Sequence, residues 1–460
     1  MNSQGLLRAV ARGETSAREI CEAAVARIEA SDAQVNAFTH RTFERARTEA
    51  AALDARRARG EPLPPLAGLP YAVKNLFDIE GVITLAGSKI NAERPPATED
   101  AVLVQRLKAA GALLLGALNM DEYAYGFTTE NTHAGPTRNP HDRTRIAGGS
   151  SGGSGAAVAA GQVPLTLGSD TNGSIRVPAS LCGAWGLKPT FGRLTRRGSF
   201  PFVHSIDHLG PIADGVQTLA LAYDAMQGPD AMDPGCHALA VQPASPTLQR
   251  GVASLRVGVL GGYFHEHATP PARAAAQAAA RALGALAVVD WPDAALARAA
   301  AFITTASEGG SLHLPNLRRR AQDFEPLSVD RFIAGALQPA DWYLKAQRFR
   351  RVYRDQVNAL FEHWDLLIAP ATPVAAPAIG TEWLDINGVK HPCRPAMGLL
   401  TQPVSFAGCP VVAAPLWPEG TGGLPIGVQL IAAPWREDLC LRAAQVLQDA
   451  GLAHVKEPAR

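Results

Sequence analysis

Serine hydroxyls and glycine amides are concentrated between residues 145 and 180, in the segment RIAGGSSGGSGAAVAAGQVPLTLGSDTNGSIRVPAS. A serine can attack a carbonyl carbon when a base takes its proton, and backbone N–H groups in a tight turn can hold the negative oxygen that forms. The apolar run VPLTLGS predicts a buried strand, and the turn after this strand ends at Ser174. The segment therefore favours a paired-serine site, in which a loop around Ser150 opens a helix over 154–160 and Ser174 follows on the next turn.

Three other interpretations fit these residues less well. A phosphate-binding loop needs a lysine in the pattern G-x-x-x-x-G-K-[ST], and no lysine lies between Arg145 and Lys188. Residues 149–153 match the G-x-S-x-G pattern of a nucleophile elbow, but the preceding NPHDRTRIAG predicts a loop instead of the buried strand that an elbow follows. A flexible linker is disfavoured because the flanking segments are apolar and predict burial in a core.

The base that would activate a serine is not a histidine of this segment, since the segment has none, and His141 and His204 fall in predicted loops. Lys74 is a better candidate because it stands in the apolar run PYAVKNLF. Burial disfavours the charged ammonium and lowers the pKa of a lysine toward the range of a useful base. A lysine at a strand end that pairs with Asp78 or Glu80 explains the same residues equally well, so the local pattern leaves both interpretations open.

The elements that must position these residues alternate between helices and short apolar strands. This alternation predicts an α/β fold with a mixed, twisted central sheet covered by helices on both faces. Ser16 and Glu19 form a capping box, so the first 60 residues predict a helical segment, with a second helix over 43–59. Further helices are predicted over 271–284 and 341–362. The expected strands lie in YAVKNLF, ALLLGAL, VPLTLGS, LRVGVLGG, DLLIAPATP, PVVAAPL and PIGVQLIAA.

Length alone suggests about three domains, but the joins are short and neither a low-complexity linker nor a repeat divides the chain. We therefore expect one large domain over residues 1–460, with a helical segment to about residue 60 and a core over about 61–215 that contains the paired serines. The remainder would complete the sheet and the substrate pocket. The weakest point of this prediction is the segment 228–255, which could join two lobes.

Composition narrows the class of function. Lysine and arginine number 43 against 42 aspartate and glutamate residues, so no basic excess indicates a nucleic acid partner. The six cysteines include no C-x-x-C pair and are typical of the reduced thiols of a cytoplasmic protein. No run of 18 apolar residues and no apolar leader occurs, which predicts a protein that is neither exported nor inserted in a membrane. Neither a metal nor an organic cofactor is expected.

Several longer motifs, namely GGSSGGSGAAVAAG, LGSDTNGSIRVPAS, GLKPTFGR, YAVKN, NPHD and PIGVQLIAAPWRE, resemble the amidase signature family over roughly residues 10 to 450. The resemblance implies a Ser–Ser–Lys triad and an acyl-enzyme. In that triad Ser174 is the nucleophile, Ser150 is a bridging serine after a cis peptide bond, and Lys74 is the base. The implied oxyanion hole consists of the backbone amides of Thr171, Asn172, Gly173 and Ser174.

One departure from the family is informative. The family commonly has two glycines before the nucleophile, whereas this chain has Asn172-Gly173, and the extra side chain narrows or polarises the site. Together with PFVHSIDHLGPIAD, LAYDAMQGPD, PLSVDRFIAGALQP and CRPAMGLLTQPVSFAGCP, this pair resembles the branch that acts on 1-carboxybiuret. The resemblance implies hydrolysis of a terminal urea-like amide with release of ammonia. The alternatives are the glutaminase subunit of an aminoacyl-tRNA amidotransferase, a broad small-amide amidase, or an inactive scaffold, and the intact serines and lysine argue against the last.

An anionic substrate of this kind needs a cation that can bind a carboxylate with two parallel hydrogen bonds. Arg331 stands alone in LSVDRFIAGAL and is the predicted carboxylate reader, with Asn172 and Ser151 as further substrate-binding candidates. The alternative is that Arg331 only pairs with Asp330 or Glu325 at the surface. The arginine runs at 318–320 and 348–354 predict solvated helix faces or partner contacts.

Two further expectations concern the turn and the assembly. Asp170 and Arg176 flank the nucleophile and are predicted to pair and hold its turn. The resemblance also implies a small helical partner subunit, in a heterotetramer or around a homodimeric core.

Overall fold

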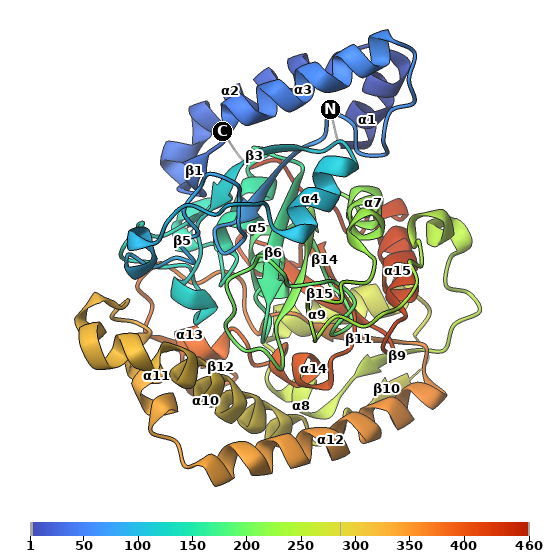
Figure 1. Ribbon diagram of the computed structural model, residues 1–460. Coiled ribbons are helices and arrows are strands. Elements are labelled where there is room, and N and C mark those ends of the chain that lie inside the picture. The colour runs from blue at the N-terminus through green and yellow to red at the C-terminus, as the bar shows by residue number, and fades with distance from the viewer. Residues whose placement is uncertain (1–2, 286, 459–460) are drawn as a thin grey trace.

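The centre of the protein is an 11-stranded mixed sheet in the order β1-β3-β2-β6-β8-β7-β14-β15-β11-β9-β10. The structure is a computed structural model that describes residues 3–285 and 287–458. The pairs β2–β3, β2–β6, β11–β9 and β9–β10 are parallel, and the remaining pairs are antiparallel. The predicted α/β fold with a mixed sheet is confirmed (Figure 1).

The strands of this sheet are β1 Phe38–Arg41, β2 Pro70–Lys74, β3 Leu113–Leu118, β6 Leu165–Asp170, β7 Trp185–Lys188, β8 His208–Ala213, β9 Val257–Leu260, β10 Ala287–Val289, β11 Leu366–Pro370, β14 Val411–Leu416 and β15 Ile426–Ile431. From β3 to β11 in the order of the sheet, every residue of each strand is buried. Such strands carry continuous apolar runs because both faces are covered. Two small hairpins, β4 Arg138–Asn139 with β5 Asp142–Ile146 and β12 Trp383–Ile386 with β13 Val389–Pro392, lie outside the sheet.

The α-helices are α1 Ser3–Arg12, α2 Ala17–Val35, α3 Phe43–Ala58, α4 Val102–Ala109, α5 Gly152–Ala159, α6 Arg176–Cys182, α7 Val216–Met226, α8 Gly262–Glu266, α9 Pro270–Ala282, α10 Ala294–Arg320, α11 Val329–Ala336, α12 Ala340–His363, α13 Cys393–Ala396, α14 Gln402–Ala407 and α15 Glu437–Asp449. Short 3-10 turns occur at Ile90–Glu93, Glu122–Ala124, Ser245–Arg250 and Ala321–Asp323. Among the described residues, no helix has an apolar stretch long enough to cross a lipid bilayer.

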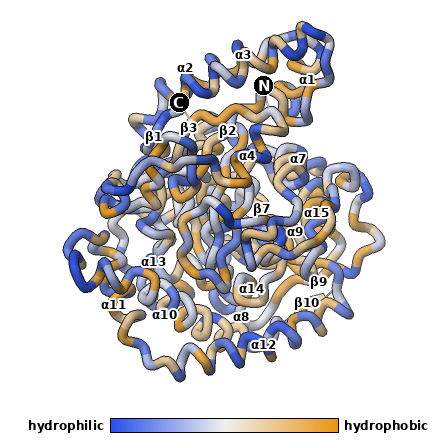
Figure 2. Tube along the Cα trace, viewed as in Figure 1, coloured by the Kyte–Doolittle hydropathy of each residue, from blue (hydrophilic) through white to orange (hydrophobic). Residues whose placement is uncertain are grey.

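Side chains of β2 alternate between two hydrophobic clusters, one on each face of the sheet. Tyr71 and Val73 belong to the cluster that includes α4, α7 and α15, whereas Ala72 belongs to the cluster that includes α2, α3 and α5. Successive strand residues point to opposite faces, so Lys74 shares the face of Ala72, where α5 packs. Figure 2 shows the hydrophobic segments gathered among the strands, with hydrophilic segments on the outer helices.

The structure corrects several details of the sequence prediction. The N-terminal segment is not helical throughout. The strand β1 lies between α2 and α3 in the chain and pairs with β3 of the central sheet. The predicted capping box of Ser16 and Glu19 is confirmed at the start of α2. The segment NPHDRTRIAG is not a loop, since it contains the hairpin β4–β5, but these strands are short and outside the central sheet, so they are not the buried strand of an elbow.

The central sheet also contains four strands that the sequence does not predict, namely β1, β7, β8 and β10. β7 and β8 lie in or beside segments that contain glycine and proline, which obscure a strand pattern. The segment 228–255 has little regular structure, yet β9, β10 and β11 continue the same sheet beyond it. The single domain over 1–460 stays a prediction, and its ends lie outside the described residues.

Candidate active site

Lys74 ends β2 inside the protein, with no exposed surface. Its Nζ donates hydrogen bonds to three serine hydroxyls, at 2.7 Å to Ser150 Oγ, 3.0 Å to Ser151 Oγ and 2.9 Å to Ser169 Oγ. Burial lowers the pKa of Lys74 to about 7, although nearby aspartates oppose this shift. In the part of the chain that is described, Lys74 forms no ion pair, so the alternative pairing with Asp78 or Glu80 is wrong.

The loop before α5 brings Ser150 to Lys74. The peptide bond between Gly149 and Ser150 is cis, as the family resemblance implies. Gly149 packs so tightly that an added Cβ would overlap Asp121 Oδ2. The amide of Asp121 donates to Ser150 O at 3.2 Å, which ties the loop to the segment after β3. Close packing therefore explains why glycine precedes the serine.

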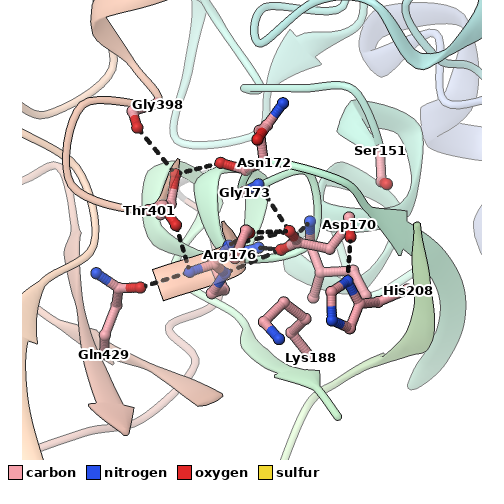
Figure 3. A network of polar contacts seen from close by, with 12 residues as sticks. Ser151, Asp170, Asn172, Gly173, Arg176, Lys188, His208, Gly398, Thr401 and Gln429 are labelled. Atoms are coloured by element: carbon pink, nitrogen blue, oxygen red, sulfur yellow. Dashed lines mark hydrogen bonds and ion pairs between the residues drawn. The ribbon is translucent and has the colours of Figure 1, made fainter. Parts of the chain in front are cut away.

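A buried ion pair holds the turn after β6. Arg176 Nε lies 2.9 Å from Asp170 Oδ2, and both side chains have no exposed surface, which confirms the predicted pair. Figure 3 shows this pair of Asp170 and Arg176. Asp170 also accepts a hydrogen bond from the amide of Ile175 at 3.2 Å. Burial alone would raise the pKa of Asp170, but the Arg176 guanidinium holds this pKa well below its usual range. A carboxylate in this state keeps the turn in one conformation.

The oxyanion hole expected from the sequence needs one correction. The amide of Gly173 donates to Asp170 Oδ1 at 2.6 Å, so this N–H is engaged by the ion pair. Within the described residues, the amides of Thr171, Asn172 and Ser174 have no acceptor in the protein. These three amides are the donors that remain for a developing oxyanion.

Thr401 fixes the other side of this turn. Its Oγ1 donates to Asn172 O at 2.7 Å, as Figure 3 shows. Gly173 has a φ of 140°, and a Cβ there would overlap Thr401 Oγ1. Only glycine fits this position because both the backbone conformation and the space exclude a side chain.

Ser174 lines a narrow cavity beside the turn. The lining residues are Ala124, Tyr125, Gly126, Phe127, Thr171, Asn172, Ser174, Phe202, Phe302, Thr305, Arg331 and Gln402. The structure thus brings Ser174, Asn172 and Arg331 to one space, although they come from distant parts of the chain. No hydrogen bond joins Ser174 Oγ to Ser150 Oγ among the described residues, and contacts of this kind often tighten only when a substrate binds.

Arg331 enters the cavity from α11. Its Nη2 donates to Tyr125 O at 2.5 Å, and the guanidinium carbon lies 4.2 Å from the centroid of the Tyr125 ring. The alternative pairing of Arg331 with Asp330 or Glu325 does not occur among the described residues. Glu325 instead accepts hydrogen bonds from the amide and the hydroxyl of Thr132, each at 2.7 Å. Burial lowers the pKa of Arg331, yet an arginine remains charged at neutral pH. In the described chain its charge has no carboxylate partner.

Asn172 contributes a polar side chain to the same cavity. Its Nδ2 donates to Thr305 Oγ1 at 2.8 Å, while its Oδ1 is buried without a partner. Figure 3 shows this side chain pointing away from the ion pair of the turn. The departure Asn172-Gly173 therefore places an unpaired acceptor beside Ser174.

Two other sequence predictions are corrected. Ser151 does not line the cavity, because its hydroxyl accepts from Lys74 and donates to Ser169 O at 3.1 Å. The run at 348–354 is not entirely a solvated face, since Arg350 is buried and donates to the backbone oxygens of Phe406 and Ser205. Arg320, in the other run, pairs with Glu93.

Sequence reasoning missed several cavity or turn residues, among them Tyr125, Phe302, Thr305, Thr401 and Gln402. The two polar residues in GLLTQPVSFAG interrupt an apolar run that the structure buries, and this interruption is the available signal for Thr401 and Gln402. Nothing local marks the others, because aromatic and threonine side chains are typical of any core.

Comparison with known proteins agrees with this geometry. The profile of the family "Amidase" matches residues 19–441. AtzE, a 1-carboxybiuret hydrolase subunit of Pseudomonas sp. (strain ADP), is 74% identical, over 99% of this chain and 100% of that relative. A glutamyl-tRNA(Gln) amidotransferase subunit of Moorella thermoacetica is 38% identical, over 97% of this chain and 96% of its own length.

A solved structure has nearly the same fold. It is described as an unexpected vestigial protein complex that reveals the evolutionary origins of an s-triazine catabolic enzyme. Its TM-score is 0.99 at 74% identity, over 99% of this chain and 100% of that chain.

Proposed function

Because the chain belongs to the amidase family, we propose that it hydrolyses the terminal urea-like amide of 1-carboxybiuret and releases ammonia. The observation that carries this proposal is the unpaired guanidinium of Arg331 in the cavity that Ser174 also lines. A half-buried cation without a carboxylate partner favours an anionic substrate. The 74% identity to a 1-carboxybiuret hydrolase subunit supports the same substrate.

The glutaminase alternative has less support. The amidotransferase subunit is 38% identical, against 74% for the 1-carboxybiuret hydrolase subunit. Glutamine also carries an ammonium group, which needs an acceptor of opposite charge. No aspartate or glutamate is among the residues that line the cavity.

In the proposed reaction, neutral Lys74 draws a proton through Ser150 from Ser174, whose Oγ attacks the terminal carbonyl carbon. The oxyanion of the tetrahedral intermediate accepts hydrogen bonds from the amides of Thr171, Asn172 and Ser174. One such donor typically contributes about 3 kcal/mol to the stabilisation of the transition state. The carbon–nitrogen bond then breaks as the relayed proton passes from Ser150 to the leaving nitrogen, which departs as ammonia. Water attacks the acyl-enzyme, and the Ser174 oxygen recovers its proton.

The contacts of Lys74 support its role as the base. A lysine that is charged at neutral pH cannot accept a proton, and burial lowers the pKa of Lys74 to about 7. The Nζ lies 2.7 Å from Ser150 Oγ, within the distance needed for direct transfer. A substantial fraction of Lys74 is therefore neutral at pH 7.

Ammonia release from a panel of substrates tests the function. The panel contains 1-carboxybiuret generated in situ, biuret, glutamine, malonamide and an aryl amide. We expect the highest kcat/KM with 1-carboxybiuret, because only this substrate offers a carboxylate to Arg331 without also carrying an ammonium group. Ser174→Ala, analysed in parallel, controls for contaminating amidases. A higher kcat/KM with glutamine would instead indicate the glutaminase function.

We also propose that the chain works with a small helical partner subunit, in a heterotetramer or around a homodimeric core. The similar solved structure is described as a protein complex, and the 74% identical relative is named as one subunit of its enzyme. Exposed apolar side chains on α10 and α12, including Leu296, Trp342 and Leu344, support a covered surface. Light scattering of the purified chain tests this: a soluble and fully active monomer would contradict the need for a partner.

A cytoplasmic location is part of the same proposal. All six cysteines are unpaired, and only Cys236 among them is not buried. Free thiols of this kind are typical of a reducing compartment.

A further inference from the structure

Gln402 lies at the start of α14 with no exposed surface, and it lines the cavity that contains Ser174 and Arg331. Its Oε1 accepts a hydrogen bond from Arg298 Nε at 3.0 Å. Its Nε2 is buried and has no partner among the described residues. A buried amide N–H without an acceptor is uncommon in proteins and requires an explanation.

The orientation of the Gln402 amide follows from its neighbour. A guanidinium only donates hydrogen bonds, so the amide oxygen must face Arg298 and the NH₂ group must face away from it. If the amide were flipped, its NH₂ group would face the N–H donor of Arg298 and no hydrogen bond could form. The Arg298 guanidinium lies 4.9 Å from the centroid of the Phe302 ring, and no described carboxylate pairs with it. A cation at the amide oxygen polarises the amide and makes its N–H groups stronger donors.

The cavity therefore presents an unpaired donor, an unpaired acceptor and a cation. The donor is Gln402 Nε2, the acceptor is Asn172 Oδ1, and the cation is Arg331. An acylurea that ends in a carboxylate has the complementary groups, namely a carbonyl oxygen, an N–H and a negative charge. An alkylurea of the same length lacks the internal carbonyl and would leave the buried donor unpaired.

We propose that Gln402 is a specificity-determining residue, whose Nε2 donates to the internal carbonyl between the scissile amide and the carboxylate of the substrate. Asn172 Oδ1 accepts an N–H of the same acylurea unit. This inference rests on the proposed function, because it assumes a carboxylated, urea-like substrate. It adds that the enzyme selects an acylurea over an alkylurea through one side chain outside the triad.

A matched pair of ligands isolates the internal carbonyl. Malonurate and 3-ureidopropionate each carry a terminal ureido group and a carboxylate at the spacing of 1-carboxybiuret. They differ only in that a carbonyl of malonurate is a methylene in 3-ureidopropionate. Competitive inhibition constants against 1-carboxybiuret, or kcat/KM where a ligand is turned over, measure their relative binding to the wild-type chain, Gln402→Leu and Gln402→Met.

We expect wild-type protein to bind malonurate more tightly, and each variant to lose roughly tenfold in malonurate binding, since removing the donor leaves a buried carbonyl unpaired. Binding of 3-ureidopropionate should change less than about twofold. Gln402→Met keeps the length of the side chain, so it serves if the leucine variant does not fold. Gln338→Leu is the matched control, because Gln338 contacts Ser307 outside the cavity lining.

Equal losses for both ligands, or no loss for either, would overturn the role of Gln402. The wild-type rate with 1-carboxybiuret tests the proposed function separately. If wild-type protein turns over 1-carboxybiuret but the variants keep the wild-type preference for malonurate, only the inference about Gln402 fails. If wild-type protein neither turns over 1-carboxybiuret nor binds malonurate, the proposed function fails and the inference fails with it.

Discussion

Replacing Arg331 by lysine tests whether this residue reads the carboxylate of the substrate. The variant keeps a positive charge but loses the planar fork that can make two parallel hydrogen bonds. In the structure, the guanidinium has no carboxylate partner among the described residues, so its free donors are available to a substrate. The bond to Tyr125 O and the contact with the Tyr125 ring hold it in place.

The expected loss follows from these contacts. Hydrogen bonds to a charged group contribute about 1.5–3 kcal/mol, which corresponds to a roughly 10- to 150-fold fall in kcat/KM. This fall should occur with 1-carboxybiuret. With biuret, which has no carboxylate, kcat/KM of Arg331→Lys should stay within about twofold of the wild-type value because the triad is unchanged.

The assay is the initial rate of ammonia release for both substrates over a range of concentrations. Arg319→Lys is the matched control, since Arg319 is exposed near the end of α10 and its one side-chain hydrogen bond within the described residues is a long one of 3.4 Å to Asn316. Equal losses on 1-carboxybiuret and biuret would refute the reasoning and indicate that Arg331 supports the segment around Tyr125. No loss on either substrate would also refute it.

The other predictions concern the triad and the turn. Ser174→Ala should lower kcat by roughly 10⁴-fold or more, whereas Ser151→Ala should keep more activity because its hydroxyl lies outside the cavity; the reverse order in rate assays would exclude Ser174 as the nucleophile. Lys74 must be neutral to act, and its pKa is lowered to about 7, so kcat/KM should rise with pH up to about 7 and then level off. A flat profile between about pH 5.5 and 8.5 would argue against Lys74 as the base. Arg176→Met leaves the Asp170 carboxylate buried without its partner and should lower the free energy of unfolding by about 3–5 kcal/mol in urea denaturation; an unchanged midpoint would contradict this.

Local residue patterns predicted much of the protein correctly. The apolar runs predicted most strands of the sheet, because a strand buried on both faces needs a continuous apolar sequence wherever it lies. The pairing of Asp170 with Arg176 was also predictable, since both residues belong to one short turn and its helix. Ser174 and Lys74 could be singled out as candidates because a polar group in a buried turn or strand end is conspicuous within its own segment, and their catalytic roles stay predictions.

The substrate pocket could not be derived in this way. Arg331 and Gln402 reach Ser174 from α11 and α14, and only the packing of these helices against the sheet decides that they share a cavity. The same holds for Ser151, whose hydroxyl turns toward Lys74, and for Gly173, whose amide is taken by Asp170. Side-chain direction and hydrogen-bond competition depend on partners that lie far away in the chain. A sequence shows which groups are capable of chemistry, whereas the tertiary structure decides which of them remain unpaired and face the same space.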